Sequence, residues 1–278
     1  MNFPRYIREI PREGGMKTGA RLYADDRIRV ESSALEQLRA AASIDPDAVV
    51  LATPDIHTGF GVPIGCVIGT ERYIIPCAVG YDIACGMRML TTPCVAADTD
   101  AAALADAIAR EIPLGEGKGN ITATGSTLTS LLQEGLCALP RLRRADARLR
   151  DVWDEAVFSR DCRHTEEGGA MDGGASAVSL RAQERGRAQI GTLGGGNHFI
   201  EVQEVTDILA PAIAREFGLF NGQLTVMIHS GSRGLGHQVG GDCMRAAREW
   251  CTANNRPMPG EKIAYLDATS SQAPPAGA

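Results

Sequence analysis

Glycine is the residue that most constrains how this chain can fold, because many of its 32 glycines gather in short apolar stretches. The segment PDIHTGFGVPIGCVIGT, at residues 54–70, has glycines at 59, 61, 65 and 69. A regular helix does not tolerate that spacing, because each glycine loses more backbone conformational entropy in a helix than any other residue does. We predict a loop followed by a strand at 54–70, and short buried strands joined by tight turns over residues 73–90.

The remaining segments show the patterns of ordinary helices and strands. Apolar runs predict strands over 20–30 and 47–52, and a buried strand that runs into a Gly/Ser loop over 224–238. Helices are expected over 98–112, 127–138, 141–158, 178–188, 206–219 and 238–253, with Asp98 as the N-cap of the first and Gly218 ending the fifth. Residues 112–120 read as a glycine-rich loop, and the tail at 268–278 as low-complexity and disordered.

Length and composition favour a globular cytosolic protein. The 278 residues can form one large domain or two ordinary ones, and 44% of them are apolar. No apolar run is long enough for a membrane helix, and the N-terminus has no secretory h-region. The eight cysteines form no CxxC pair, which is typical of reduced, mostly buried thiols. A net charge of −6 gives no global attraction to nucleic acid, although a local basic patch could still bind it.

The segment LTVMIHSGSRG places His229 where a predicted strand ends. Ser230, Ser232 and Arg233 follow among glycines, so this loop offers backbone N–H groups, two hydroxyls and a guanidinium. That combination suits phosphate or another oxyanion. The alternative is a tight strand-to-helix turn that carries a surface arginine.

A second group of residues has the chemistry of a metal site. GYDIACGMR places Asp82 and Cys85 three positions apart between glycines, and GTLGGGNHFIEVQ carries His198. Taken alone, these residues are better explained as a capping carboxylate, a buried free thiol and a structural histidine. Together with His229 they make a full set of oxygen, sulfur and imidazole donors for Mn²⁺ or Zn²⁺.

Several common nucleotide-binding and catalytic signatures are missing. GEGKGN at 115–120 lacks the spacing of a P-loop, GSRGLG lacks that of a dinucleotide fingerprint, and no G-x-S-x-G elbow occurs. The basic stretches at 141–150 and 181–187 are most simply solvated helix faces. They could also contact RNA phosphates.

Four segments, in this order, resemble the RtcB-type RNA ligases, the tRNA-splicing ligase family. They are PDIHTGFGVPIG, GYDIACGMR, GTLGGGNHFIEVQ and HSGSRGLGHQV, and TEEGG and ERGRAQIGTLG are also similar to that family. The resemblance covers residues 1–266, which we expect to form the N-terminal portion of an RtcB-like catalytic domain. Residues 267–278 are expected to form the tail.

The resemblance implies an α/β (α+β) fold with a central metal-binding cleft. It also implies an RNA ligase of tRNA splicing or RNA repair that joins a 3′-phosphate or 2′,3′-cyclic phosphate end to a 5′-hydroxyl. Two Mn²⁺ ions and GTP are the implied cofactors. A histidine of the family becomes guanylylated, and GMP then passes to the RNA 3′-phosphate. Forming a mixed anhydride divides one difficult displacement into easier steps.

The resemblance also implies roles for individual residues. Asp82, Cys85, His198 and His229 match metal ligands, with Asp82 and Cys85 reaching both ions. Asn197 and Glu201 match nucleotide-binding positions, and Ser230, Ser232 and Arg233 are implied to lie against phosphate. Asp55 and His57 belong to the first shared motif, with a weaker role in shaping the cleft.

The sequence departs from the family pattern in two places. The family's C-terminal His-Asn and His-Gly-Ala-Gly-Arg motifs, the latter with the nucleophilic histidine, are not found, and no histidine follows His237. We therefore expect a fold that is incomplete at its C-terminus, no self-guanylylation by this chain, and an exposed apolar patch. A second chain that supplies the remainder is an open alternative. The smaller departure is Cys66, where glycine is more usual.

Two other function classes remain open on the residues alone. One is a metal-binding protein that holds RNA ends or nucleotides without ligating them. The other is a metal-dependent cyclic phosphodiesterase or phosphatase that opens a cyclic phosphate without joining ends.

Overall fold

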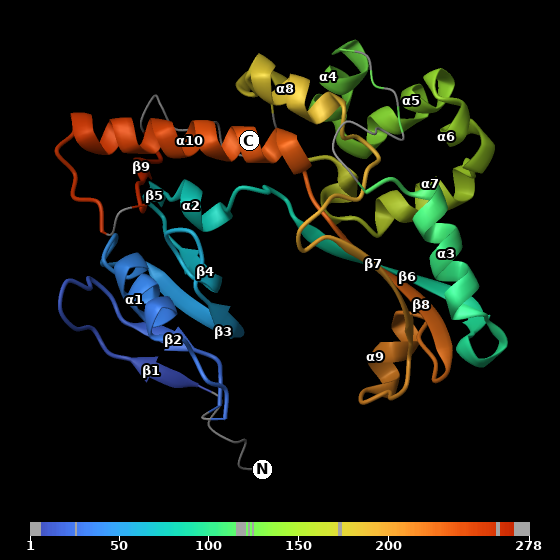
Figure 1. Ribbon diagram of the computed structural model, residues 1–278. Helices are drawn as coiled ribbons and strands as arrows, with labels where there is room; N and C mark the ends of the chain where they lie inside the picture. The colour runs from blue at the N-terminus through green and yellow to red at the C-terminus, as the bar shows by residue number, and fades with distance from the viewer. Residues whose placement is uncertain are drawn as a thin grey trace. The chain divides into compact units, whose positions relative to one another are not determined.

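The computed structural model describes residues 7–25, 27–114, 121, 123, 125–171, 174–259 and 262–269 (Figure 1). The strands are β1 (Arg8–Ile10), β2 (Ala20–Leu22), β3 (Val49–His57), β4 (Ile64–Gly69), β5 (Tyr73–Ile74), β6 (Gly86–Val95), β7 (Phe199–Glu204), β8 (Gln223–Ser230) and β9 (Leu266–Asp267). The α-helices are α1 (Ser32–Ala41), α2 (Pro76–Val79), α3 (Ala101–Glu111), α4 (Gly125–Glu134), α5 (Leu139–Ala145), α6 (Ala147–Val152), α7 (Glu155–Arg163), α8 (Leu180–Arg187), α9 (Pro211–Glu216) and α10 (Arg233–Ala253). Short 3₁₀ helices are η1 (Ala96–Asp98), η2 (Gly135–Ala138), η3 (Glu166–Gly169) and η4 (Ala175–Ala177).

These residues group into two compact units. The first holds the described residues up to Tyr81 and those from Val239 onward, and the second holds those from Asp82 to Gln238. The mixture of sheets and helices confirms the expected α/β class. The single catalytic region expected over residues 1–266 stays a prediction.

The first unit contains a four-stranded sheet in the order β1-β2-β3-β4. Strands β2 and β3 are parallel, and α1 is the crossover that such a connection requires. Helix α1 lies against this sheet (Figure 1) and buries Ala34, Leu38 and Ala41 completely, at the i, i+4 and i+7 spacing of one helix face. The C-terminal part of α10 adds Ala247 and Cys251 to the same core.

The second unit contains a three-stranded antiparallel sheet in the order β6-β8-β7. Its central strand β8 pairs Ile228 with Arg88 on one side and with Ile200 on the other. Helices α3 to α9 also belong to this unit. Strand β6 leaves several large apolar side chains exposed, namely Met87, Met89, Leu90 and Val95. The expected apolar patch stays a prediction.

The strand predictions are partly wrong. The strand expected over 20–30 ends at Leu22, whereas the one expected over 47–52 runs on to His57. The buried strands expected over 73–90 are instead β5, the short helix α2 and the largely exposed β6. Pro76 stands in the first turn of α2, where its fixed φ and missing N–H suit a helix start.

The helix predictions have the right regions but several wrong ends. The N-cap of α3 is Asp100, which accepts a hydrogen bond from the amide of Ala103, and not Asp98. The helix expected over 141–158 is divided into α5, α6 and α7, and Asp154 caps the last of these. Helix α9 occupies only part of the range expected over 206–219, followed by Gly218 at φ 68°.

Helix α10 begins at Arg233, five residues before the expected start, and so takes in Gly234 and Gly236 in addition to Gly240 and Gly241. Neighbouring groups lie against Gly234, Gly236 and Gly240, whereas a Cβ at Gly241 would meet no atom within 4 Å. A Cβ at Gly234 would be 3.0 Å from the side-chain oxygen of Gln189, and one at Gly240 would be 3.2 Å from the carbonyl oxygen of Gly80. Close packing therefore offsets the low helix propensity of glycine.

The glycine-rich loop at 115–120 and most of the tail lie outside the described residues. Among the helices that the structure describes, none is both long and apolar enough to span a bilayer.

Candidate metal centre

The candidate ligands come from three strand ends of the second unit. Asp82 and Cys85 form a turn just before β6, closed by a hydrogen bond of 3.0 Å from the Cys85 amide to the Asp82 carbonyl. Ala84 inside this turn has φ 60°, a conformation that a residue with a Cβ rarely adopts. His198 directly precedes β7, and His229 is the penultimate residue of β8. Antiparallel pairing of β6 and β7 with β8 brings these ends together.

The side chains of Cys85, His198 and His229 converge in one cluster, with their ligand atoms within 4.8 Å of one another. The Cys85 Sγ atom lies 3.4 Å from Nε2 of His198 and 3.1 Å from Nε2 of His229. Asp82 joins the cluster through Oδ2, which lies 2.7 Å from Nε2 of His198. The side chain of His198 is only 3% exposed, so its ring is held inside the protein.

These distances fit a bound divalent cation. Metal–sulfur bonds of about 2.3 Å and metal–nitrogen bonds of about 2.0–2.1 Å at tetrahedral angles place sulfur and nitrogen about 3.5 Å apart. The two observed sulfur–nitrogen distances are 3.4 and 3.1 Å, so ligation needs only small side-chain shifts. One thiol, two imidazoles and one carboxylate also form a donor set of intermediate softness, as expected for Zn²⁺ or Mn²⁺.

The carboxylate of Asp82 is held by the start of α10. Its Oδ1 atom accepts hydrogen bonds from the amide of Arg233 at 2.8 Å and from the hydroxyl of Ser232 at 3.2 Å. Amides at a helix N-terminus favour a negative charge. Asp82 is therefore fixed through Oδ1, while Oδ2 faces His198.

Two glycines leave room for these side chains. Gly194 has φ 112°, and a Cβ there would collide with Nδ1 of His198 and with the guanidinium of Arg233. A Cβ at Gly231 would lie 2.7 Å from the Cγ atom of Asp82. Both positions are thus restricted to glycine by the side chains of the cluster, which explains part of the glycine enrichment in the two loops.

Partial burial raises the pKa of the Cys85 thiol, and the neighbouring Asp82 carboxylate raises it further. Both effects disfavour ionisation of the Cys85 thiol beside the negatively charged Asp82 carboxylate. A cation placed between the two groups reverses that balance, because thiolate is the form that binds a metal.

The comparison with known proteins decides the family. The family model described as "tRNA-splicing ligase RtcB" matches residues 37–274. This chain belongs to the RtcB family. The sequence resemblance drawn from the four motifs is thereby confirmed.

Curated relatives carry the same description. The "tRNA-splicing ligase RtcB" of Thermococcus kodakarensis is 35% identical over 276 residues, which are 95% of this chain and 55% of the relative. The protein of that name from Archaeoglobus fulgidus is 37% identical over 254 residues, 84% of this chain and 48% of the relative. The one from Aeropyrum pernix is 35% identical over 289 residues, 97% of this chain and 56% of the relative. The chain thus spans about half the length of these RtcB relatives.

The nucleotide-binding positions suggested by the RtcB motifs differ in their distance from the cluster. The side-chain nitrogen Nδ2 of Asn197 lies 3.4 Å from Nε2 of His229. Asn197 is exposed, so it lies at the solvent side of the candidate metal ligands. Glu201 lies further along β7, opposite Met227, and accepts a hydrogen bond of 2.9 Å from Gln203. The described contacts therefore place Asn197 at the cluster and do not place Glu201 there.

The three residues expected to contact phosphate are next to the cluster, but two already have internal partners. The hydroxyl of Ser230 donates to the carbonyl of Leu193 at 2.8 Å. The hydroxyl of Ser232 contacts Asp82 and the carbonyl of Ile83. In contrast, the buried Nε of Arg233 has no hydrogen-bond partner among the residues that the structure describes.

Asp55 and His57 end β3 in the first unit, where Nδ1 of His57 lies 2.7 Å from the Asp55 carbonyl oxygen. Their role in shaping the cleft stays a prediction. Cys66, the departure from the family pattern, lies on β4, and burial raises the pKa of its thiol to about 12.

Sequence reasoning missed Met87 and Phe199, which contact His229. Only the strand register reveals them.

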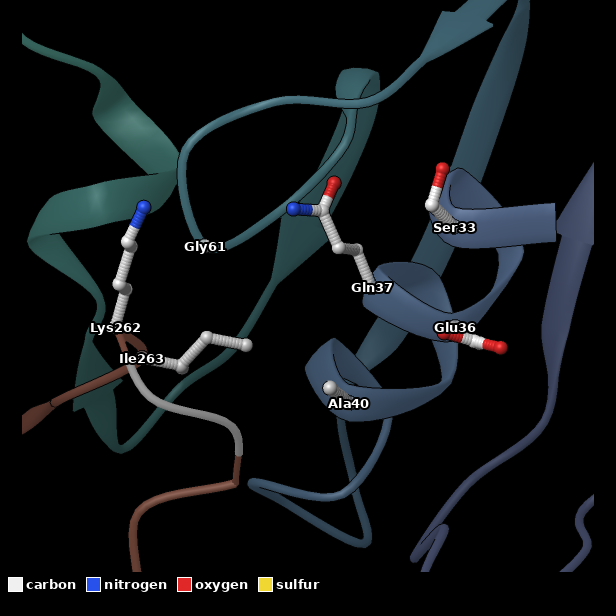
Figure 2. A pocket seen from close by; sticks show the side chains of 7 residues that line it. All are labelled: Ser33, Glu36, Gln37, Ala40, Gly61, Lys262 and Ile263. Carbon is white, nitrogen blue, oxygen red and sulfur yellow. The ribbon is translucent and has the colours of Figure 1, made fainter. Parts of the chain in front are cut away.

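A separate cavity of about 440 Å³ lies in the first unit, beside one face of α1 (Figure 2). Its most central polar group is the amide of Gln37, which already exchanges hydrogen bonds of 2.8 and 2.9 Å with the backbone of Gly59. The Nζ atom of Lys262 lies 4.3 Å from the centre of the Phe60 ring. The side chains of Gln37 and Lys262 are thus engaged with the protein itself.

Proposed function

We propose that this chain forms a manganese-binding part of a GTP-dependent RNA ligase. The reaction is the joining of an RNA 3′-phosphate or 2′,3′-cyclic phosphate end to a 5′-hydroxyl end, in tRNA splicing or RNA repair. The observation that carries the proposal is the convergence of Cys85, His198 and His229 in a member of the RtcB family. The curated relatives named as tRNA-splicing ligases support the same reaction.

Cys85, His198, His229 and Asp82 would hold the cation. When bound, a divalent cation neutralises phosphate charge and so lowers the barrier to attack at phosphorus. The protein supplies the fixed geometry: the amide of Arg233 and the hydroxyl of Ser232 orient Asp82. Burial of His198 excludes water from one side of the site. In the same proposal, Asp82 and Cys85 would also help to hold a second cation.

The phosphate of an RNA end or of GTP would approach from the side of Asn197. That side chain is exposed and lies next to His229, so its amide can donate a hydrogen bond to an incoming oxyanion. The guanidinium of Arg233 adds positive charge nearby, with its Nε unsatisfied by the described residues. Ser230 and Ser232 act through Leu193 and Asp82, which they hold in place. Glu201 remains a proposed contact to the nucleotide.

RNA binding by the 278-residue chain tests this proposal. We expect RNA that ends in a 3′-phosphate to bind more tightly with Mn²⁺ than without it, and more tightly than the same RNA with a 3′-hydroxyl. Cys85→Ala should abolish that preference, whereas Cys94→Ala, at an exposed cysteine of β6, should keep it. Equal binding of both RNAs, with or without Mn²⁺, would contradict the proposal.

Two further outcomes separate the ligase from the other function classes. The chain spans about half the length of these relatives. The ligation reaction is therefore proposed for the whole protein, including any second chain that takes part, and not for these residues alone. Because the family's nucleophilic histidine motif is not among these residues, labelled GTP should leave no covalent adduct on this chain. Opening of a 2′,3′-cyclic phosphate without joining would instead favour a cyclic phosphodiesterase.

A further inference from the structure

His229 lies in the middle strand of its sheet, directly between two side chains. In the antiparallel register, Met87 of β6 and Phe199 of β7 are both paired with His229 of β8. Directly paired residues project from the same face of a sheet, because side chains alternate along each strand. The imidazole of His229 is therefore flanked by a thioether on one side and an aromatic ring on the other.

The two nitrogens of His229 face different surroundings. Nδ1 lies 2.8 Å from the Sδ atom of Met87. Nε2 lies 3.1 Å from the Sγ atom of Cys85 and so points into the candidate metal cluster. The Phe199 ring stacks on the imidazole, with ring centres 5.5 Å apart and an angle of 20° between the planes. Stacking limits ring tilt, and the contact with Met87 limits rotation about the Cβ–Cγ bond.

A thioether can only accept a hydrogen bond, so the contact with Met87 favours one form of the neutral imidazole, the same form that the Asn197 Nδ2 atom, 3.4 Å from Nε2, favours from the other side of the ring. The proton must lie on Nδ1 to be donated to sulfur, and the lone pair is then on Nε2. A metal needs that lone pair, and the hydrogen bond of the other nitrogen usually sets which nitrogen is available. His198 differs, because its Nδ1 has no hydrogen-bond partner among the described residues.

We propose that Met87 is a positioning residue that presents Nε2 of His229 as a metal donor. This inference rests on the proposed metal site, and it adds how one of its ligands is prepared before any cation arrives. The usual acceptor for the second nitrogen of a metal-binding histidine is a carboxylate, a carbonyl oxygen or water. Here a sulfur atom on the neighbouring strand takes that place. The thioether is a weak acceptor, so its effect depends on the close approach of Met87, which the strand register places opposite His229.

The first test is the imidazole tautomer in the metal-free protein, read from the ¹⁵N shifts of the histidine ring by NMR. The parent chain should show His229 with its proton on Nδ1. Met87→Leu keeps a similar volume but removes the acceptor, so a mixture with the Nε2-protonated form is expected. Met87→Gln restores an acceptor oxygen and should recover the Nδ1-protonated form. Met89→Leu, two residues along the same strand, should leave the tautomer unchanged.

The second test is Mn²⁺ affinity measured by calorimetry on the same four proteins. Loss of a hydrogen-bond partner behind a metal-binding histidine weakens binding about 10–100-fold, and the lower end applies to a thioether. We expect Met87→Leu to weaken binding about 10-fold, with Met87→Gln intermediate and Met89→Leu equal to the parent. If Met87→Leu keeps the parent tautomer and affinity, the positioning role is wrong. If the parent binds no Mn²⁺, the proposed function fails, while the tautomer measurement still decides the role of Met87.

Discussion

Replacing Gly194 by alanine should weaken metal binding, whereas the same replacement at its neighbour Gly195 should not. The two residues stand side by side before His198, yet their surroundings differ. A Cβ at Gly195 meets no atom within 4 Å. A Cβ at Gly194 would lie 2.6 Å from Cζ of Arg233 and would overlap Nδ1 of His198. Non-bonded carbon atoms normally stay about 3.5–4.0 Å apart, so the overlap is roughly 1 Å.

The expected magnitudes follow from strain and overlap. Alanine at the φ of 112° found at Gly194 costs about 1–2 kcal/mol of backbone strain, and overpacking adds about 1–3 kcal/mol. We therefore expect Gly194→Ala to lower the free energy of unfolding of the metal-free chain by about 2–5 kcal/mol. Gly195→Ala should change it by less than about 0.5 kcal/mol.

The effect on metal affinity separates the role of the site from general stability. The arginine can move its flexible end, but the buried imidazole of His198 must shift away from the cluster. Mn²⁺ affinity should therefore fall about 10–100-fold in Gly194→Ala, as it does when the support of a metal ligand is lost. Gly196→Ala is an intermediate control, because its φ of 74° imposes strain of about 1 kcal/mol without any steric contact.

Urea unfolding in the presence of a chelator measures the stabilities, and calorimetric titration with Mn²⁺ measures the affinities. The reasoning is refuted if Gly194→Ala binds Mn²⁺ as tightly as Gly195→Ala. It is also refuted if Gly196→Ala loses as much affinity as Gly194→Ala, since strain alone would then account for the result.

Three further predictions concern the backbone, the pH dependence and the thiols. Ala84→Gly should raise the free energy of unfolding by about 0.5–1 kcal/mol in urea, because alanine at φ 60° is strained, although glycine also favours the unfolded chain. Hydrogen bonds from Thr269 lower the pKa of Asp267 from 3.8 to about 2, so its carboxylate stabilises the fold above pH 4 and loses that effect as the pH falls towards 2. Asp267→Asn should thus melt earlier than the parent near neutral pH, with a difference that shrinks in acid. Burial raises the pKa of Cys66 to about 12 and of Cys77 to about 11, so peptide mass spectrometry should find both alkylated far more slowly than the exposed cysteines.

Local sequence signals located most elements but not their ends. A carboxylate before an alanine-rich segment correctly indicated a helix start, yet both Asp98 and Asp100 fit that signal. Only the hydrogen bond from the Ala103 amide distinguishes them. Asp154 interrupts a segment that has continuous helical propensity, because its side chain caps the amides of Ala156 and Val157. Competition between two good local signals is settled by contacts that the sequence does not show.

At the start of α10, in contrast, the local sequence signal was misleading. Gly234 and Gly236 argue against a helix by propensity, and the prediction of a loop up to residue 238 was wrong for this reason. Tertiary contacts decide the matter: a Cβ at Gly236 would be 3.0 Å from the amide nitrogen of Ile83. The packing partner is some 150 residues earlier in the chain, so no local pattern could reveal it.

The candidate ligands themselves were predictable because their chemistry is unusual. Few histidines occur in the chain; Cys85, His198 and His229 each stand near glycines, and His229 lies at a predicted strand end. What could not be predicted is which neighbours orient them. The pairing of Met87 with His229 depends on strand register, and a shift of one residue would turn Met87 to the other face.

Absorption spectroscopy with Co²⁺ in place of Mn²⁺ tests the central claim that these residues form one metal site. A cysteine thiolate bound to Co²⁺ gives an intense ligand-to-metal charge-transfer band, which imidazole and carboxylate ligands do not give. We predict this band in the parent chain and in Cys94→Ser, its loss in Cys85→Ser, and weaker Co²⁺ binding in His198→Ala and His229→Ala. A parent chain that binds Co²⁺ without the band, or a band that survives in Cys85→Ser, would contradict the account.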